Sequence, residues 1–223
     1  MKLLREKKCV IFLSALAMSL LCSCSMMLHT KPRKDAIKNL SDIKWTGNDI
    51  GAERKMRMDG FYIDSCSNYC LIFFADGTCA ECYIKGLNLE QMQKDLAACV
   101  YWTGYKRGRW GYNVGVYEVE DSLIYANYYY SDFFMFCNLW RDMTKVVYRV
   151  EDANTITLID KCDYDILSNK AYKRDTVVKY QFYHSDVMPF SHNKMKKKKW
   201  MWSDQEAWRK YRQEYRHRNS RKK

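Results

Sequence analysis

The sequence has 223 residues, a formal net charge of +12 and ten cysteines, and it is long enough for one domain with a hydrophobic core. Its positive charge lies at the two ends: residues 24–190 hold 21 Lys/Arg against 22 Asp/Glu, whereas residues 191–223 hold 13 against three. This distribution excludes a uniformly basic folded body and restricts charge-based functions to the termini.

The N-terminal segment has the composition of a secretion signal. Residues 1–8 are net positive, and an apolar run follows from Cys9 to Leu21. Leu21-Cys22-Ser23-Cys24 resembles a lipobox, the site at which a bacterial lipoprotein precursor is acylated and cleaved. The resemblance implies a signal peptide over residues 1–23, fatty acyl chains such as palmitate on Cys24, and a cell-envelope location. Ser25, rather than an acidic residue, follows the acylated position, and this resembles the pattern of outer-membrane lipoproteins.

Two other interpretations of this segment stay open. The uncharged stretch from Cys9 to Leu28 is about long enough to span a bilayer without being cleaved. Cleavage by the ordinary signal peptidase after Ala15-Leu16-Ala17 is also conceivable, although it leaves an apolar stretch on the mature protein. All three interpretations place the bulk of the chain outside the cytoplasm.

The next segments predict a tether and then a β-rich domain. Residues 24–43 are polar and predict a flexible tether, and residues 44–190 contain short runs rich in Tyr, Val, Ile, Phe and Thr, as strands do. Asp76-Gly77 predicts a tight hairpin, and residues 120–122 and 151–154 predict two more. The expected strands cover residues 61–63, 71–74, 79–84, 111–119, 123–130, 146–150, 155–159 and 175–183.

One helix is expected to interrupt the strands. Asn88 is a suitable N-cap for a helix over residues 89–100, with Leu89, Met92, Leu96 and Cys99 on one apolar stripe. Successive hairpins that close on themselves predict a mainly β fold. The expected form is an antiparallel meander that makes a small barrel or sandwich, with one inserted helix and a basic C-terminal helix.

Residues 44–184 resemble the lipocalin-like domains found in many envelope lipoproteins. The matching pieces are Lys44-Trp45, residues 73–78, Trp110 to Ile124, and residues 150–158. The helix over residues 88–100 and the aromatic segment over residues 128–140 depart from that pattern. The resemblance implies a β-barrel scaffold that holds a ligand, without naming the ligand.

Seven cysteines follow Cys24, so at least one of them remains outside intramolecular disulfides: Cys66, Cys70, Cys79, Cys82, Cys99, Cys137 and Cys162. The spacings of the first four are compatible with zinc, but side chains alternate along a strand, so Cys79 and Cys82 point to opposite faces. Pairing of Ala75 with Thr78 places Cys82 opposite Leu71 and Cys70 on the other face. We therefore expect no metal site, and either buried thiols or a single disulfide.

Aromatic side chains are concentrated in residues 128–140. At a barrel mouth, Phe133, Phe134, Phe136 and Trp140 are candidate contacts for an unknown small ligand or a protein partner. In the simpler interpretation they only cover an open barrel end, because large aromatic side chains dominate cores as well as interfaces.

Residues 191–223 predict a basic, partly helical tail. Ser203-Asp-Gln-Glu206 predicts a capping box that opens a helix with Trp208, Tyr211 and Tyr215 on one face. The candidate contacts with an anionic surface are Lys196, Lys197, Lys198, Lys199, Arg209, Arg212 and Arg216. For an exported chain, anionic lipid or an acidic envelope polymer is a more natural target than nucleic acid. Alternatively, the tail is a solvated extension whose Trp residues pack on the barrel.

The sequence contains no recognisable catalytic constellation. Of its four histidines, three lie in the expected tether or tail, and His184 follows directly on the last expected strand. The carboxylates of Glu118, Glu120, Asp163 and Asp165 lie around expected turns. It also contains no phosphate-binding glycine loop and no nucleophile elbow. We expect a non-enzymatic envelope lipoprotein without a cofactor, which binds a ligand or partner. The alternative is a structural tether, in which the basic tail contacts a second acidic surface and deletion of residues 191–223 leaves the domain folded.

Overall fold

The computed structural model describes residues 36–46, 49–64, 69–83, 88–96, 113–134, 137–165, 170–175, 177–189 and 194–220. The strands are β1 (Gly60–Ile63), β2 (Tyr69–Phe73), β3 (Thr78–Tyr83), β4 (Asn113–Glu120), β5 (Leu123–Phe134), β6 (Cys137–Asp152), β7 (Thr155–Asp165), β8 (Lys170–Arg174) and β9 (Val178–His184). The helical elements are η1 (Ala52–Arg54), α2 (Leu89–Lys94), η3 (Lys194–Lys197), η4 (Lys199–Met201) and α4 (Gln205–Ser220).

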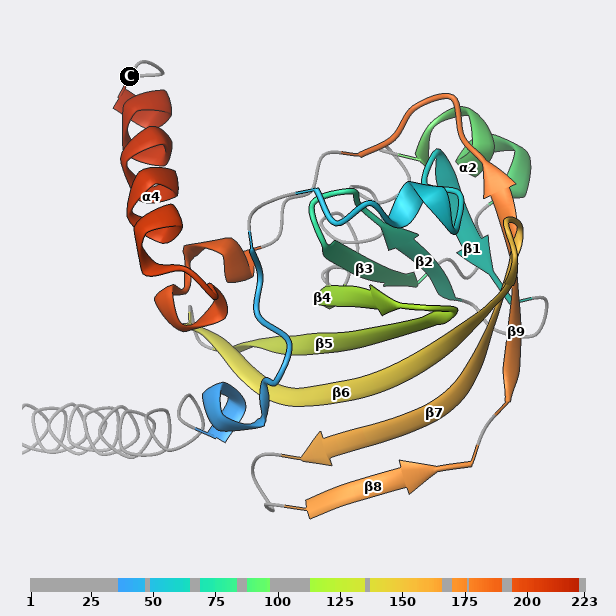
Figure 1. The fold of residues 1–223 in the computed structure, drawn as a ribbon, viewed down its shortest axis with the longest axis horizontal. Helices are drawn as coiled ribbons and strands as arrows, with labels where there is room; N and C mark the ends of the chain where they lie inside the picture. The colour runs from blue at the N-terminus through green and yellow to red at the C-terminus, as the bar shows by residue number, and fades with distance from the viewer. Residues whose placement is uncertain are drawn as a thin grey trace, which may run out of the picture.

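The strands form a closed, eight-stranded antiparallel barrel. Neighbouring strands follow the chain order from β1 to β7, and β9 closes the ring by pairing with both β7 and β1 (Figure 1). Strand β8 lies outside the ring; among the described strands it pairs with the C-terminal half of β7 alone, from Lys161 opposite Arg174 to Asp165 opposite Lys170. The predicted mainly β fold with an inserted helix and a C-terminal helix is confirmed, and its form is a barrel.

One end of the barrel is closed by the segment that contains η1. Ala52 and Met56 of this segment are buried in the interior core. Its backbone also bonds to two hairpin turns, because Ile50 donates to the carbonyl of Ala75 and Arg57 donates to the carbonyl of Ala153. The opposite end is therefore the one at which β3 ends and β4 begins.

The β2–β3 hairpin has a different register from the predicted one. The Phe74 amide donates to the Thr78 carbonyl at 2.9 Å, and Gly77 adopts a φ of 77°, so the turn contains three residues instead of two. The predicted pairing of Ala75 with Thr78 is wrong by one residue, and Cys70 lies directly opposite Cys82. Cys70 and Cys82 consequently share one face of the sheet, against the prediction that they lie on opposite faces.

Helix α2 covers the outer face of the β2–β3 hairpin. The Asn88 side chain accepts a bond from the Glu90 amide at 2.8 Å, which confirms the predicted N-cap. Met92 and Leu96 are buried against the thiols of β2 and β3, whereas Leu89 is exposed and does not join the predicted stripe. Residues 97–100 lie outside the described part of the chain.

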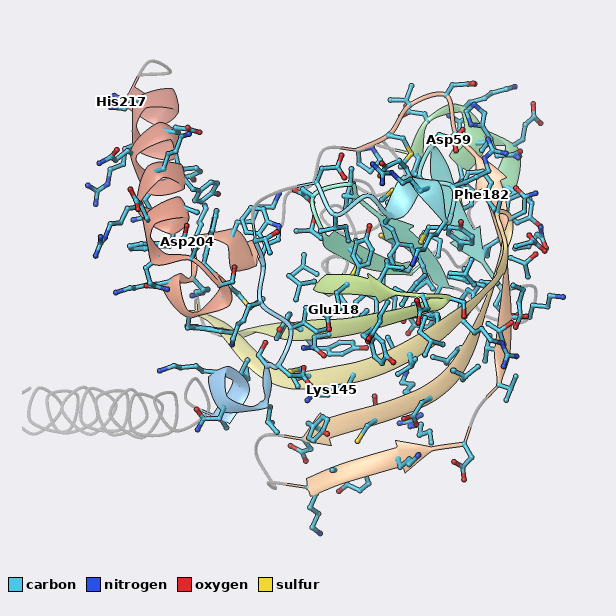
Figure 2. The ribbon with its side chains drawn as sticks, in the orientation of Figure 1. Asp59, Glu118, Lys145, Phe182, Asp204 and His217 are labelled. Atoms are coloured by element: carbon cyan, nitrogen blue, oxygen red, sulfur yellow. The ribbon has the colours of Figure 1, made fainter. Side chains whose placement is uncertain are left out.

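Residues 36–46, most of which fall in the predicted tether, pack on the outer face of the barrel. Residues 36–40 form a helix that buries Ile37. Asp42 then accepts a bond from Asn127 at 2.8 Å and pairs at 2.5 Å with Lys145, which Figure 2 shows on β6. Within the described residues, no helix combines the length and the apolar character needed to cross a bilayer.

Candidate functional site

The predicted anchor and the predicted aromatic contacts lie mostly beyond what the structure describes. Cys24 and Phe136 are outside the described residues. Phe133 and Phe134 lie on β5, and Trp140 lies on β6 of the same hairpin, past an irregularity in register between Tyr130 and Ser131. The backbone thus brings three of the four predicted aromatic residues to one extended hairpin.

The tail packs beside the segment over residues 36–46. Trp45 and Trp202 form a parallel bridge, in which the Trp45 amide donates to Met201 at 2.7 Å and the Ser203 amide donates to Trp45 at 3.0 Å. The two indole rings lie 4.3 Å apart, and Met201 is fully buried. The Trp residues of the tail therefore belong to a second core on the outside of the barrel.

Helix α4 presents aromatic side chains to this second core and cations to solvent. Trp208 and Tyr211 pack on it, and the Tyr215 ring lies 6.2 Å from that of Tyr211, so the predicted face is present. The helix begins one residue later than predicted, because Asp204 accepts a bond from the Glu206 amide and replaces Ser203 as the cap. Figure 2 shows Asp204 at the base of this helix and His217 near its far end.

The seven predicted surface cations differ in their surroundings. Lys196 is 13% exposed and pairs with Asp76 of the β2–β3 turn, so an intramolecular partner holds it. Lys197 lies over the Tyr215 ring at 4.6 Å, and Lys199 and Arg212 each lie 6.0 Å from the Trp208 ring. Lys198 also has an interaction within the chain. Arg209 and Arg216 are exposed, as is the neighbouring Lys210.

A group of polar side chains faces the barrel interior at the end opposite η1; we call it the interior polar cluster. Its members are Glu81, Asn113, Tyr128, Tyr130, Thr144 and Asp163. Glu81 lies opposite Leu71, which belongs to the interior core, and residues opposite one another share a face. The same alternation places Thr144 and Asp163, which are opposite one another on β6 and β7, beside Val146 of that core.

Glu81 is the carboxylate at the centre of this cluster. It accepts a bond from Asn113 at 2.8 Å and another from the hydroxyl of Tyr130 at 3.3 Å. Both donors are neutral, and none of the cations in the described residues forms an ion pair with Glu81. A half-buried carboxylate without a cationic partner is available to a ligand that brings a donor or a positive charge.

Asp163, in contrast, is satisfied within the chain. It accepts a bond from Thr144 at 2.6 Å and pairs with Arg174 of β8 at 2.8 Å. The sequence placed this carboxylate around a turn, but it lies inside β7 and is only 22% exposed.

Burial raises the pKa of Tyr130 well above its ordinary value, and the negative charges of Glu81 and Asp163 raise it further.

Tyr128 contributes a buried hydroxyl to the cluster. Its side chain is 1% exposed, and its oxygen makes no hydrogen bond of ordinary geometry among the described residues, although the Tyr148 hydroxyl and the Cys79 thiol lie beside it. Burial raises the pKa of this phenol well above its usual range, and the Cys79 thiol, Tyr148 and Glu81 are close enough to raise it further. A buried hydroxyl whose hydrogen bonding is incomplete costs free energy, so a ligand that forms a hydrogen bond of good geometry with it recovers part of that cost.

The interior polar cluster was not predicted from the sequence. The one indication of it in the sequence is Glu81, a single charged residue in an otherwise apolar strand. Whether the Glu81 side chain points into the barrel or out of it depends on the register of the β2–β3 hairpin. His184, which the sequence singled out, lies on the surface with its ring nitrogens 3.1 Å from Asp59 and 3.6 Å from Asp186. Within the described residues, no group of three or more His, Cys, Asp or Glu is arranged to hold a metal ion.

Comparison with protein-family models, with curated protein sequences and with solved structures finds no match for this chain. The closed eight-stranded barrel followed by a C-terminal helix is nevertheless consistent with a lipocalin-like fold. Such a barrel is compatible with ligand binding.

Proposed function

We propose that the protein is a non-enzymatic lipoprotein of the cell envelope, fixed to a membrane through Cys24, whose barrel binds a small ligand or a partner. The observation that carries the binding role is the buried hydroxyl of Tyr128, which makes no hydrogen bond of ordinary geometry among the described residues and lies beside Glu81. The lipobox resemblance of Leu21-Cys22-Ser23-Cys24 supports the anchor and the location.

The interior polar cluster supports binding better than a purely structural role. Stability alone is served by apolar interiors, because buried polar groups that are only partly satisfied cost free energy. Among the described residues, Glu81 has no cationic partner and the Tyr128 hydroxyl makes no hydrogen bond of ordinary geometry, whereas Asp163 bonds to Thr144 and pairs with Arg174. A ligand with hydrogen-bonding groups fits this unequal arrangement.

Binding is tested on the full chain in detergent with phosphatidylglycerol, phosphatidylethanolamine and soluble peptidoglycan fragments as probes. Native mass spectrometry and thermal shift measure binding to the wild type, Glu81→Gln and Tyr128→Phe. We expect at least one probe to bind the wild type and to lose about tenfold in affinity with either substitution, since one hydrogen bond is worth about 1.4 kcal/mol. Absence of binding by every probe, or equal binding by all three proteins, argues against a ligand site in the barrel.

The position of the tail supports a second candidate function, a two-point attachment to one anionic membrane. Trp45 and Trp202 join the tail to the segment that leads back to Cys24. Figure 1 shows α4 and the blue segment over residues 36–46 on the same side of the barrel. Residue 36 is 12 residues from Cys24, a coil length of about 20 Å. The cations of α4 therefore lie within reach of the membrane that holds the lipid, where each exposed Lys or Arg adds about 1 kcal/mol.

The structure also changes how this candidate is tested. Deletion of residues 191–223 removes Met201 and Trp202 from a buried core. We therefore no longer expect the domain to tolerate this deletion, and loss of membrane binding after it could result from unfolding. The triple variant Arg209→Glu, Lys210→Glu, Arg216→Glu changes only exposed positions. We expect it to weaken salt-sensitive binding to phosphatidylglycerol vesicles by about 100-fold or more. Clustering of vesicles by the wild type would instead favour contact with a second surface, and unchanged binding would reject both.

A further inference from the structure

Cys70 and Cys82 face each other across the β2–β3 hairpin. They are directly opposite in the register, and their side chains are 0% and 1% exposed. Opposite residues of an antiparallel pair have Cα atoms about 4.5 or 5.5 Å apart, and both separations lie within the range of about 4.4–6.8 Å that disulfides span. The backbone therefore already has the separation that a disulfide between these residues requires.

No other two of the described cysteines share this relationship. Cys79 lies opposite Phe73 and faces the barrel interior. Cys162 of β7 lies opposite Lys145 and Lys173 and is half-exposed. Met92 and Leu96 of the α2 region cover the Cys70–Cys82 pair, so packing brings the two thiols together and excludes water from them.

We propose that Cys70 and Cys82 form a disulfide that fixes β2 to β3 beneath α2, which rests on the proposed envelope location for its oxidant. In this step the two S–H bonds break and one S–S bond forms. The two electrons and two protons pass, through a mixed disulfide, to the disulfide of a protein of the thiol–disulfide exchange class, which is reduced to a dithiol.

The surroundings of the pair also determine when the bond forms. The pKa of the Cys82 thiol lies well above its ordinary value, mainly because of the hydrogen bond between Cys82 and Cys70 and secondly because of burial. Because the thiolate is the reactive form, exchange in the folded protein is slow in both directions. The disulfide therefore forms while the hairpin is still accessible, and after folding it is protected from soluble reductants.

The test uses the full chain, exported to an oxidising compartment and purified without reductant, with free thiols blocked by N-ethylmaleimide in denaturant. Chymotrypsin cleaves after Tyr69, which separates Cys66 from Cys70, and a glutamyl endopeptidase cleaves after Glu81, which separates Cys79 from Cys82. We expect mass spectrometry to find a linked peptide that contains Cys70 and Cys82. Cys70→Ser should abolish this peptide, whereas the control Cys79→Ser should retain it.

Maleimide on both Cys70 and Cys82 of exported protein, or a bond from either to another cysteine, overturns the proposal. The same digest shows whether Cys24 carries acyl chains, so loss of the anchor is distinguished from loss of the disulfide. If the chain is not exported, reduced protein is refolded in a glutathione redox buffer, and the same digest then shows which cysteines have paired. The native disulfide should react with dithiothreitol at least about 100-fold more slowly than the urea-unfolded one, and equal rates contradict its burial.

Discussion

Lys196, in the C-terminal tail, pairs with Asp76, which lies 120 residues earlier in the turn of the β2–β3 hairpin. The Lys196 ammonium group also lies 4.7 Å from the centre of the Trp45 ring, whose indole N–H donates to the Asp76 carbonyl. One turn of the barrel thus holds both the segment that leads to the N-terminus and the basic tail.

Replacement of Lys196 by Met should loosen the tail. The methionine keeps most of the apolar stem but removes the charge, which leaves Asp76 partly buried without its cation. Because the pair is neither fully exposed nor fully buried, we expect a loss of about 2 kcal/mol in the free energy of unfolding. Urea unfolding followed by tryptophan emission measures this loss, and limited proteolysis reports release of the tail.

Lys210→Met is the matched control, because Lys210 is an exposed residue of α4. A surface substitution of this kind changes stability by about 0.5 kcal/mol at most. Equal effects of the two substitutions would show that Lys196 does not fix the tail to the barrel.

Replacement of Tyr128 by Phe should stabilise the protein while it weakens binding. The substitution removes a buried hydroxyl that makes no hydrogen bond of ordinary geometry among the described residues, and we expect a gain of about 1 kcal/mol in the free energy of unfolding. Tyr117→Phe is the control: its hydroxyl donates to the Phe74 carbonyl at 2.9 Å, so the same chemical change should cost about 1 kcal/mol. A loss of stability in Tyr128→Phe would mean that this hydroxyl is satisfied in solution.

Much of the barrel was predictable, because its hairpins have local signals. Turns at Asp76-Gly77 and at residues 120–122 were recognised from their residue types, and the strands beside them lie close to where they were expected. Strand β8 was missed because its sequence Lys170–Arg174 is polar and all five of its residues are exposed. Strand β6 is longer than expected, since its N-terminal part lacks the apolar alternation used to find it.

The interior polar cluster was less predictable, because it depends on long-range geometry. Whether Glu81 faces the interior depends on a three-residue turn, and a difference of one residue reverses the face of every side chain in the strand. The contact of Lys196 with Asp76 joins residues far apart in the sequence, so composition reveals the charges but not their partners.

Replacement of Gly60 by Ala should disturb closure of the barrel. Gly60 begins β1 opposite His184 of β9, and an added Cβ would lie 2.0 Å from the carbonyl oxygen of Tyr183. Because that neighbour is backbone, relief requires the two strands to separate, and we expect a cost of about 3 kcal/mol. Urea unfolding measures the cost, and hydrogen exchange should show loss of protection confined to β1 and β9. A stability equal to that of the wild type would contradict the close approach of these strands.

Buried phenols should make the protein sensitive to alkaline pH. Burial raises the pKa of several tyrosines above the ordinary value of about 10, and the largest group lines the barrel interior: Tyr62, Tyr117, Tyr128, Tyr148 and Tyr180.

The folded state therefore keeps protons that the unfolded state releases, so stability is full below about pH 9 and falls as the pH rises through about 10. Each such tyrosine removes up to about 1.4 kcal/mol per pH unit above that value. Urea midpoints between about pH 8 and about pH 11, with phenolate absorbance recorded on the same samples, measure this dependence. Ionisation of these phenols should coincide with unfolding, because the folded barrel does not admit the charged form. Phenolate absorbance that rises fully while the barrel remains folded would show that the interior is open to water.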